Sequence, residues 1–316
     1  MTDNQFLGIS LALVAACSWG FSSVFFKSVL KSNKSIQELL FSITIRGVIA
    51  VPFIAFLTLF LYSNNSISLF QVLLSQELFP LLILSSIFVT IGDVLFFGSL
   101  QRTDVSKAQP VASIYPLFTA ILLIILGVEV ISLIVVAGIF LLIVGISLVS
   151  QQKNKSSSSD EIYDLQIGLI LAVIAAIFWS LAIITVRLIL EDPMANVFVL
   201  ATLRFGILTI ITTICWFIII LNLVSQQKEE RIIYITNSRK EIFVLGLGGI
   251  LGWGIGAISF FSSIDLIDAS RATAISSINP IVAIILGIFV LKEKLSNIQA
   301  IGILLVVFGS ILVSLF

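Results

Sequence analysis

Ten uninterrupted apolar stretches dominate this sequence, and each is about as long as a helix that crosses a lipid bilayer. A bilayer core about 30 Å thick requires about 20 helical residues. Only three ionisable residues, Arg46, Asp93 and Arg204, lie inside these stretches. The chain is 59% hydrophobic and 11% charged, whereas about 25% of residues are charged in soluble domains. The stretches run Phe6–Phe26, Leu39–Tyr62, Phe79–Leu100, Ala108–Val128, Val130–Ser150, Leu165–Val186, Val197–Leu223, Ile242–Ile264, Ala272–Leu291 and Ile298–Phe316. The pattern predicts an all-α polytopic membrane protein with ten transmembrane helices.

The two halves of the chain repeat one another. The segment from Asp104 to Ser132 aligns without gaps with Asp268 to Ser296, and the same offset places Gly138 on Gly302 and Gly145 on Gly309. We therefore divide the chain into a first five-helix repeat (1–150), a polar, serine-rich linker (151–164) and a second five-helix repeat (165–316). Because five is an odd number, the second repeat must enter the membrane inverted. Secondary transporters commonly have this architecture, with the solute held at the midplane between the repeats.

Basic residues gather in the loops that follow the odd-numbered stretches. The opposite loops contain only Arg187 and Arg271. By the positive-inside rule, the odd-numbered exits lie in the cytoplasm and both termini lie outside.

Several elements recur in the same order in both halves. The elements are a tryptophan near the end of each first helix (Trp19, Trp179), an arginine early in each second helix (Arg46, Arg204), a proline in each fourth helix (Pro116, Pro280), and the pattern E-x-x-S-x(5)-G-x(6)-G at Glu129 to Gly145 and Glu293 to Gly309. In these elements the chain resembles, over nearly its whole length, the EamA family of the drug/metabolite transporter (DMT) superfamily. The resemblance implies gradient-driven export or exchange of amino acids and small metabolites across the cell (inner) membrane.

The charged residues in and beside the membrane are candidates for gating and coupling. A lipid-facing arginine in the hydrocarbon layer is costly, so Arg46 and Arg204 should face a cavity or a partner. Glu293 falls in the same membrane half as Arg46, and Glu129 in that of Arg204. Each pair could work as a gate that forms and breaks, or as a fixed structural contact. Asp93 could couple transport to protons, or it could form a structural ion pair with Arg46.

A second set of candidates could line a solute pocket with aromatic walls, hydroxyls and one amide. Core packing is the alternative interpretation for each of them singly. Pro116 and Pro280 should kink their helices and expose backbone carbonyls. Such a pocket suits a neutral or zwitterionic small molecule. The candidates are Trp19, Ser22, Asp93, Phe97, Tyr115, Trp179, Trp253 and Asn279.

The sequence also limits the function classes. It contains no histidine and no clustered metal ligands, so we expect no enzyme, no metal site and no cofactor. The absence of a Walker sequence excludes a self-contained ATP-driven pump. The leading hypothesis is a secondary transporter that works by alternating access. A translocator of a lipid-linked intermediate and a non-transporting receptor are the alternatives. The expected partners are a small-molecule solute, the bilayer and a proton or another coupling ion, with no nucleic acid, and the protein should be a monomer or weak homodimer.

Overall fold

The structure is a computed structural model that describes residues 3–29, 35–62, 75–103, 105–149, 159–193, 195–225, 239–282, 285–286 and 297–315. Regular secondary structure in these ranges is helical throughout. The helices are α1 (Asp3–Val29), α2 (Ile36–Tyr62), α4 (Leu78–Arg102), α5 (Val105–Ala112), α6 (Tyr115–Ile125), α7 (Leu133–Val149), α8 (Ser159–Leu190), α9 (Val197–Ser225), α10 (Arg239–Gly249), the π-helix η2 (Ile250–Gly256), α11 (Ala257–Ile267), α12 (Ala269–Ser276) and α14 (Asn297–Leu315).

These helices correspond to the predicted membrane-spanning stretches. Within the described residues, seven helical stretches are long and apolar enough to cross a membrane, and the shorter apolar helix Leu133–Leu148 is an eighth candidate. The eighth predicted stretch is the continuous run α10–η2–α11. The ninth contains α12 and a helical segment at 279–282. The tenth is α14. The prediction of a polytopic helical fold is therefore confirmed.

Several predicted boundaries differ from the structure by a few residues, among them the starts of α8 and α7. Helix α8 begins at Ser159 and not at Leu165, so the last part of the predicted linker is helical. Helix α7 begins at Leu133 and not at Val130. The delay arises because Gly127, with a φ of 66°, ends α6 with paired hydrogen bonds from its own N–H and that of the next residue to carbonyls in the last turn. The Ser132 hydroxyl then caps the start of α7 by accepting a hydrogen bond from the Val135 N–H.

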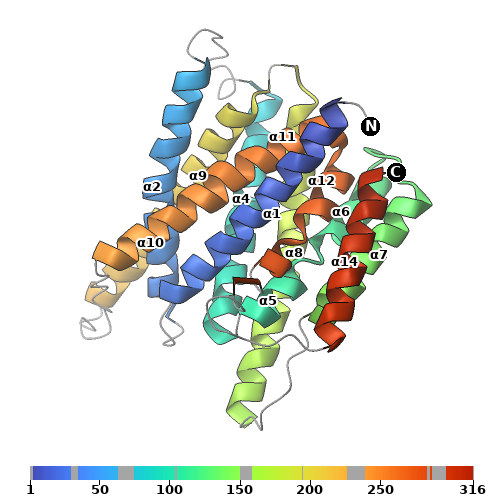
Figure 1. Cartoon of the computed structure of the whole chain (residues 1–316). Helices are drawn as coiled ribbons and strands as arrows, with labels where there is room; N and C mark the ends of the chain where they lie inside the picture. Colours follow the sequence, from blue (N-terminus) through green and yellow to red (C-terminus); the bar gives the residue numbers. More distant parts are fainter. Residues whose placement is uncertain are drawn as a thin grey trace.

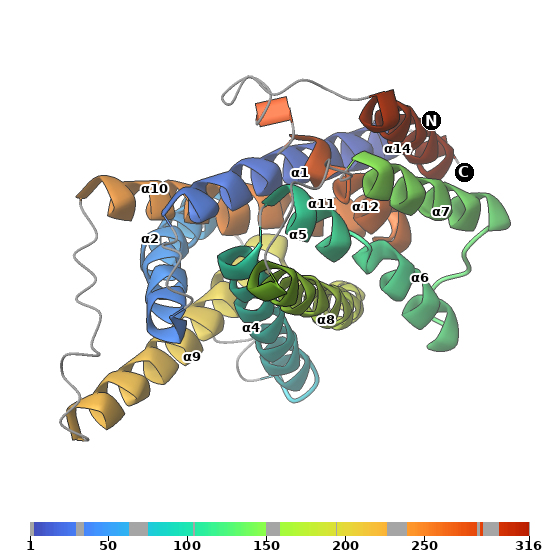
Figure 2. The same ribbon diagram turned by 90° about the horizontal axis from the view of Figure 1, so that it is seen from below.

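The helix contacts are related by a pseudo-two-fold symmetry (Figures 1 and 2). Helix α1, the first of its repeat, packs on η2 and α11 of the second repeat, while α8, the first of the second repeat, packs on α4. Helices α2 and α9, which are equivalent second helices, pack on each other, and so do the fifth helices α7 and α14. Exchanging the repeats therefore reproduces the same set of contacts. The inverted-repeat architecture explains why both termini lie at the same end of the molecule in Figure 1.

The repeated glycines allow a close crossing of α7 and α14. A β-carbon added at Gly138 would lie 3.0 Å from the carbonyl oxygen of Gly309, and one added at Gly145 would lie 2.7 Å from that of Gly302. Such distances leave no room for a side chain, so the glycines let α7 and α14 pack backbone to backbone. The G-x(6)-G spacing is thus a packing motif.

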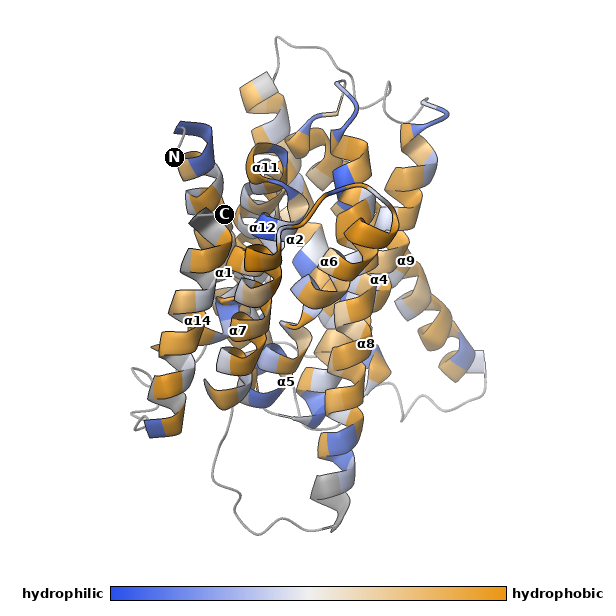
Figure 3. Ribbon diagram, turned by 90° about the vertical axis from the view of Figure 1, so that its right-hand side faces the viewer, coloured by the Kyte–Doolittle hydropathy of each residue, from blue (hydrophilic) through white to orange (hydrophobic). Residues whose placement is uncertain are grey.

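The outer surface is apolar and the charged groups inside the membrane are buried. Figure 3 shows hydrophobic residues over most of each helix and hydrophilic ones mainly at helix ends and loops. On α9, for example, Ile214 and Ile218 are more than half exposed, as expected for a surface that faces lipid tails. In contrast, Arg46, Asp93 and Arg204 are 2%, 6% and 4% exposed.

Candidate functional site

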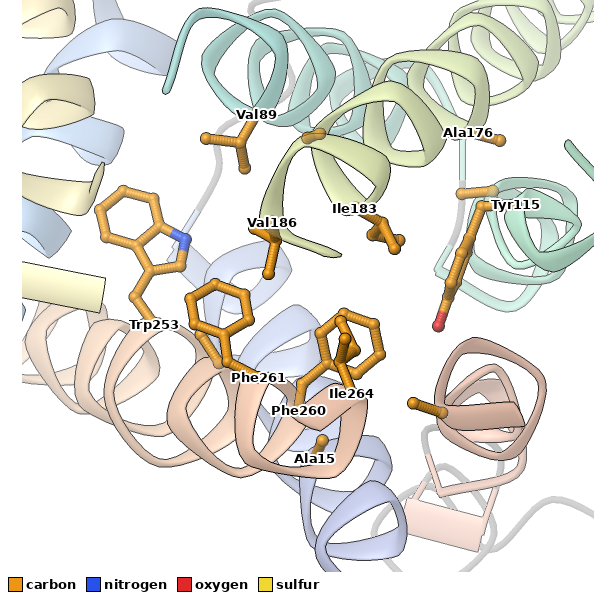
Figure 4. Packing of buried hydrophobic residues seen from close by; sticks show 14 of the residues in the cluster. Ala15, Val89, Tyr115, Ala176, Ile183, Val186, Trp253, Phe260, Phe261 and Ile264 are labelled. Carbon is orange, nitrogen blue, oxygen red and sulfur yellow. The ribbon is translucent and has the colours of Figure 1, made fainter. Parts of the chain in front are cut away.

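One cavity of about 120 Å³ lies between the two repeats and collects nearly all the predicted site residues. Figure 4 shows part of its wall, where Val89 and Ile183 face the aromatic rings of Trp253, Phe260 and Phe261. The full lining consists of Trp19, Ser22 and Ser23 from α1, Arg46 from α2, Val89, Asp93, Phe96 and Phe97 from α4, Gln109 from α5, Tyr115 from α6, Trp179 and Ile183 from α8, Arg204 and Phe205 from α9, Gly252 and Trp253 from η2, Ala257, Phe260 and Phe261 from α11, and Asn279. Every residue nominated for solute contact is in this set.

Two indole groups of the second repeat hold the Asp93 carboxylate, which belongs to the first repeat. The Trp179 Nε1–H donates to Oδ1 at 2.9 Å, and the Trp253 Nε1–H donates to Oδ2 at 3.1 Å. In the described part of the chain, no lysine or arginine nitrogen comes within 4.0 Å of this carboxylate. The direct ion pair with Arg46, one of the two interpretations of the sequence, is therefore not formed. The direct hydrogen-bond donors to Asp93 are these two neutral indole groups.

The Arg46 guanidinium sits among aromatic rings. Its Nη2 donates to the Ser22 Oγ at 2.9 Å and to the Gly248 carbonyl at 3.4 Å. Its Cζ lies 5.1, 4.7 and 4.8 Å from the ring centroids of Phe26, Phe97 and Trp253, within the range of cation–π attraction. Two of its nitrogens, Nε and Nη1, are buried without a hydrogen-bond partner.

Arg204, the equivalent arginine of the second repeat, has a similar setting. Its Cζ lies 5.7 Å from the ring centroid of Phe205 and 5.1 Å from that of Phe261. Its Nε is buried and has no hydrogen-bond partner. The cavity thus contains two guanidinium groups with unused donors and one carboxylate whose oxygens each accept an indole N–H.

The two proline-containing helices break where they meet the cavity. Helix α5 ends at Ala112 and α6 restarts with Pro116 in its first turn; α12 ends at Ser276 and the chain becomes helical again at Asn279, beside Pro280. The breaks contact each other across the repeats. The Ser113 hydroxyl donates to the Asn279 side-chain oxygen at 2.8 Å, and the Tyr115 and Ser276 hydroxyl oxygens are 2.8 Å apart.

Glycines set the position of the first-helix tryptophans. A β-carbon at Gly92 would lie 2.5 Å from Cδ1 of Trp179, and one at Gly256 would lie 2.9 Å from Cδ1 of Trp19. The Trp19 Nε1–H donates to the Gly252 carbonyl at 2.9 Å, inside the π-helix η2. The Cδ1–Nε1 edge of each indole therefore packs against the third helix of the other repeat, where only glycine leaves enough space.

Glu129, one of the two predicted glutamates, does not line the cavity. It forms an ion pair with Arg187 at 3.3 Å and accepts hydrogen bonds from the backbone N–H groups of Ala269 and Ser270 at 2.8 and 3.1 Å. In this structure Glu129 is therefore paired with Arg187 and not with Arg204, and it caps the start of α12, where its charge also complements the helix dipole. Glu293 lies outside the described residues.

The sequence interpretation missed several lining residues. Phe96, Phe260 and Phe261 were not nominated, although the Phe96–Phe97 pair aligns with Phe260–Phe261 at the same offset as the rest of the repeat. That alignment was a usable signal. Gln109 had no comparable signal, and its Oε1 is buried without a hydrogen-bond partner.

The fold and the cavity define a class: an integral, multi-pass membrane transporter built from two repeats. The family model described as "EamA-like transporter family" matches residues 6–151 and again residues 166–315. The chain belongs to this family. It is 24% identical over 310 residues to an uncharacterized transporter of Archaeoglobus fulgidus, with 98% of each chain covered. It is 30% identical over 142 residues to an uncharacterized protein of Methanocaldococcus jannaschii, and this alignment covers 45% of this chain and 95% of the relative. A solved crystal structure shares the fold with a TM-score of 0.69 at 15% identity, covering 96% of this chain and 95% of the other.

Proposed function

We propose that this protein is a secondary active transporter, and not an enzyme, that exports or exchanges a small organic solute such as an amino acid or a similar metabolite. The observation that carries the proposal is the central cavity. It is lined by both repeats, and it contains the buried charges Arg46, Asp93 and Arg204. Buried ionisable groups in a membrane protein typically mark a transport pathway.

The pseudo-symmetry supports alternating access as the proposed mechanism. If one repeat rocks against the other around the cavity, each side of the membrane gains access in turn. The contact among Glu129, Arg187 and the start of α12 joins the first repeat to the second at one end of the bundle, and we propose that it works as a latch on that side. Glu293, its sequence equivalent, is the candidate for the opposite side. Arg46 and Arg204 would act in the cavity itself.

Proton coupling at Asp93 belongs to the same proposal. Asp93 is buried in the cavity, and it interacts electrostatically with both Arg46 and Arg204. A carboxyl group that faces the solute can gain or lose a proton as the cavity exchanges sides. The indole N–H groups of Trp179 and Trp253 would hold it in place during that exchange.

Proteoliposomes test the transport function directly. Vesicles with purified protein would be loaded with a defined mixture of amino acids and small metabolites, and efflux would be followed by mass spectrometry. We expect at least one solute to leave faster than from protein-free vesicles. Arg204→Ala should abolish this efflux while the yield of folded protein is kept. Arg239→Ala, at the exposed start of α10, is the matched control and should transport normally.

Two results would overturn the proposal. One is the absence of protein-dependent efflux for every solute, which would favour a receptor. The other is protein-dependent movement of a lipid-linked compound alone, which would favour a translocator of lipid-linked intermediates.

A further inference from the structure

The cavity holds more positive than negative charge. Arg46 and Arg204 contribute two guanidinium groups, and Asp93 is the single carboxyl group among the lining residues. If Asp93 is ionised, one positive charge remains in excess; if it carries a proton, two remain. In both states, an empty cavity leaves buried positive charge uncompensated, which is costly in a medium of low dielectric constant.

Both arginine side chains line the cavity, so an anion in the cavity would lie beside two guanidinium groups. Within the part of the chain that the structure describes, Nε and Nη1 of Arg46 and Nε of Arg204 are buried without a hydrogen-bond partner, so the protein leaves these groups incompletely compensated, which is unfavourable. An oxyanion in the cavity would compensate the charge, and guanidinium groups suit carboxylates particularly well.

We infer that the preferred solute is a small organic monoanion, a carboxylate with a short apolar body, held by Arg46 and Arg204. This inference rests on the proposed transport function. A zwitterion of the same shape adds no net charge, so it leaves the excess uncompensated.

The remaining wall argues for an organic and not an inorganic anion. Apart from the charged groups and a few amide and hydroxyl groups, the cavity is lined by aromatic rings and aliphatic side chains, among them Phe96, Phe260 and Ile183. Its volume is about 120 Å³, and an apolar cavity of ~150 Å³ holds benzene. The apolar body should therefore have only a few carbon atoms.

Three compounds that share an isopropyl body test the inference. Isovalerate carries a net negative charge, valine is a zwitterion, and isobutylamine is a cation. Binding to purified protein in detergent would be measured by isothermal titration calorimetry at fixed ionic strength. We expect isovalerate to bind at least tenfold more tightly than valine, and isobutylamine to show no binding. Equal or tighter binding of valine would overturn the inference. Competition by chloride or phosphate as effective as that of isovalerate would overturn its organic part.

Charge variants make the test specific to these residues. Arg204→Gln removes one positive charge, so the ratio of isovalerate to valine affinity should fall at least tenfold. The control Arg239→Gln, outside the cavity, should leave the ratio unchanged. Asp93→Asn preserves side-chain shape and increases the positive excess, so the ratio should rise. A fall in that variant, or an unchanged ratio in Arg204→Gln, would contradict the inference.

Transport measurements separate this inference from the proposed function. Counterflow of labelled valine, faster than that of isovalerate, would refute the charge preference and leave the transporter intact. Tight binding of isovalerate with no movement of any solute across the vesicle membrane would refute the transporter and leave the charge preference intact.

Discussion

Replacing Gly92 with alanine should disturb the cavity without touching any charged group. The added β-carbon would lie 2.5 Å from Cδ1 and 2.8 Å from Nε1 of Trp179, closer than atoms can approach. The Trp179 ring must therefore move away from α4. Its Nε1–H would then lose the 2.9 Å hydrogen bond to Asp93, although the carboxylate and both arginines stay in the chain.

The magnitude follows from three opposing terms. Alanine is favoured over glycine inside a helix by about 1 kcal/mol. Loss of a hydrogen bond to a charged group costs about 1.5–3 kcal/mol, and forcing an extra methyl group into a packed site costs about 1–3 kcal/mol. The net expectation for Gly92→Ala is a loss of about 1.5–5 kcal/mol of unfolding free energy. Gly98, on the same helix, is the control, since a β-carbon there would meet its nearest neighbours at 3.8 Å, and Gly98→Ala should stabilise the protein.

Unfolding in mixed micelles of sodium dodecyl sulfate and a mild detergent would measure both variants, and proteoliposome efflux would measure function. A double-mutant cycle identifies the cause. In a Trp179→Ala background the steric conflict disappears, so Gly92→Ala should become neutral or stabilising. The reasoning would be refuted if Gly92→Ala behaved like Gly98→Ala, or if it remained equally destabilising without the Trp179 ring.

Three further predictions concern the latch, the helix breaks and the coupling residue. Glu129→Gln and Arg187→Gln should each alter the rate of solute exchange. Because both substitutions remove the same ion pair, the double variant should show less than the sum of the two effects. Additive effects would argue against a latch. Tyr115→Phe should lower the unfolding free energy by about 0.5–1.5 kcal/mol, because it removes the hydroxyl that is hydrogen-bonded to Ser276. A larger loss in the same unfolding assay would indicate a different role. Asp93→Asn should abolish the dependence of efflux on a pH gradient and leave solute exchange intact, and an unchanged pH dependence would exclude proton coupling at this residue.

The sequence was most informative about features that depend on local composition and on the repeat. Span positions follow from runs of apolar residues, and the helix breaks beside Pro116 and Pro280 follow from the lack of a proline N–H. The membership of the cavity was also largely predictable, because buried polar or aromatic residues in a membrane helix need a shared interior. Their alignment at one offset, as with Phe97 and Phe261, strengthens such a prediction.

Contacts between distant helices were much less predictable. The two hydrogen bonds to Asp93 depend on how α4, α8 and η2 are rotated about their axes, and residue spacing along the chain does not determine that rotation. The same holds for Glu129, whose side chain reaches the start of α12 and not Arg204. Arg46, Asp93 and Arg204 lie far apart in the sequence, and considered one at a time they led to the prediction of a neutral or zwitterionic solute. The excess of positive charge becomes visible only when Arg46 and Arg204 are found in one cavity.

The charge distribution is asymmetric although the helix framework is symmetric. Trp19 and Trp179 occupy equivalent positions, yet the first donates to the Gly252 carbonyl and the second to Asp93. The residue that aligns with Asp93 in the second repeat is Ala257. Under the proposed alternating access, a symmetric framework would let the two repeats exchange roles as the cavity opens to one side or the other. An asymmetric set of charges means that the solute meets the same carboxylate, on the same side of its binding site, in both states. A solute with a charged end and an apolar end would therefore keep one orientation during transport, and swapping Asp93 and Ala257 (Asp93→Ala with Ala257→Asp) should reverse that orientation or abolish binding.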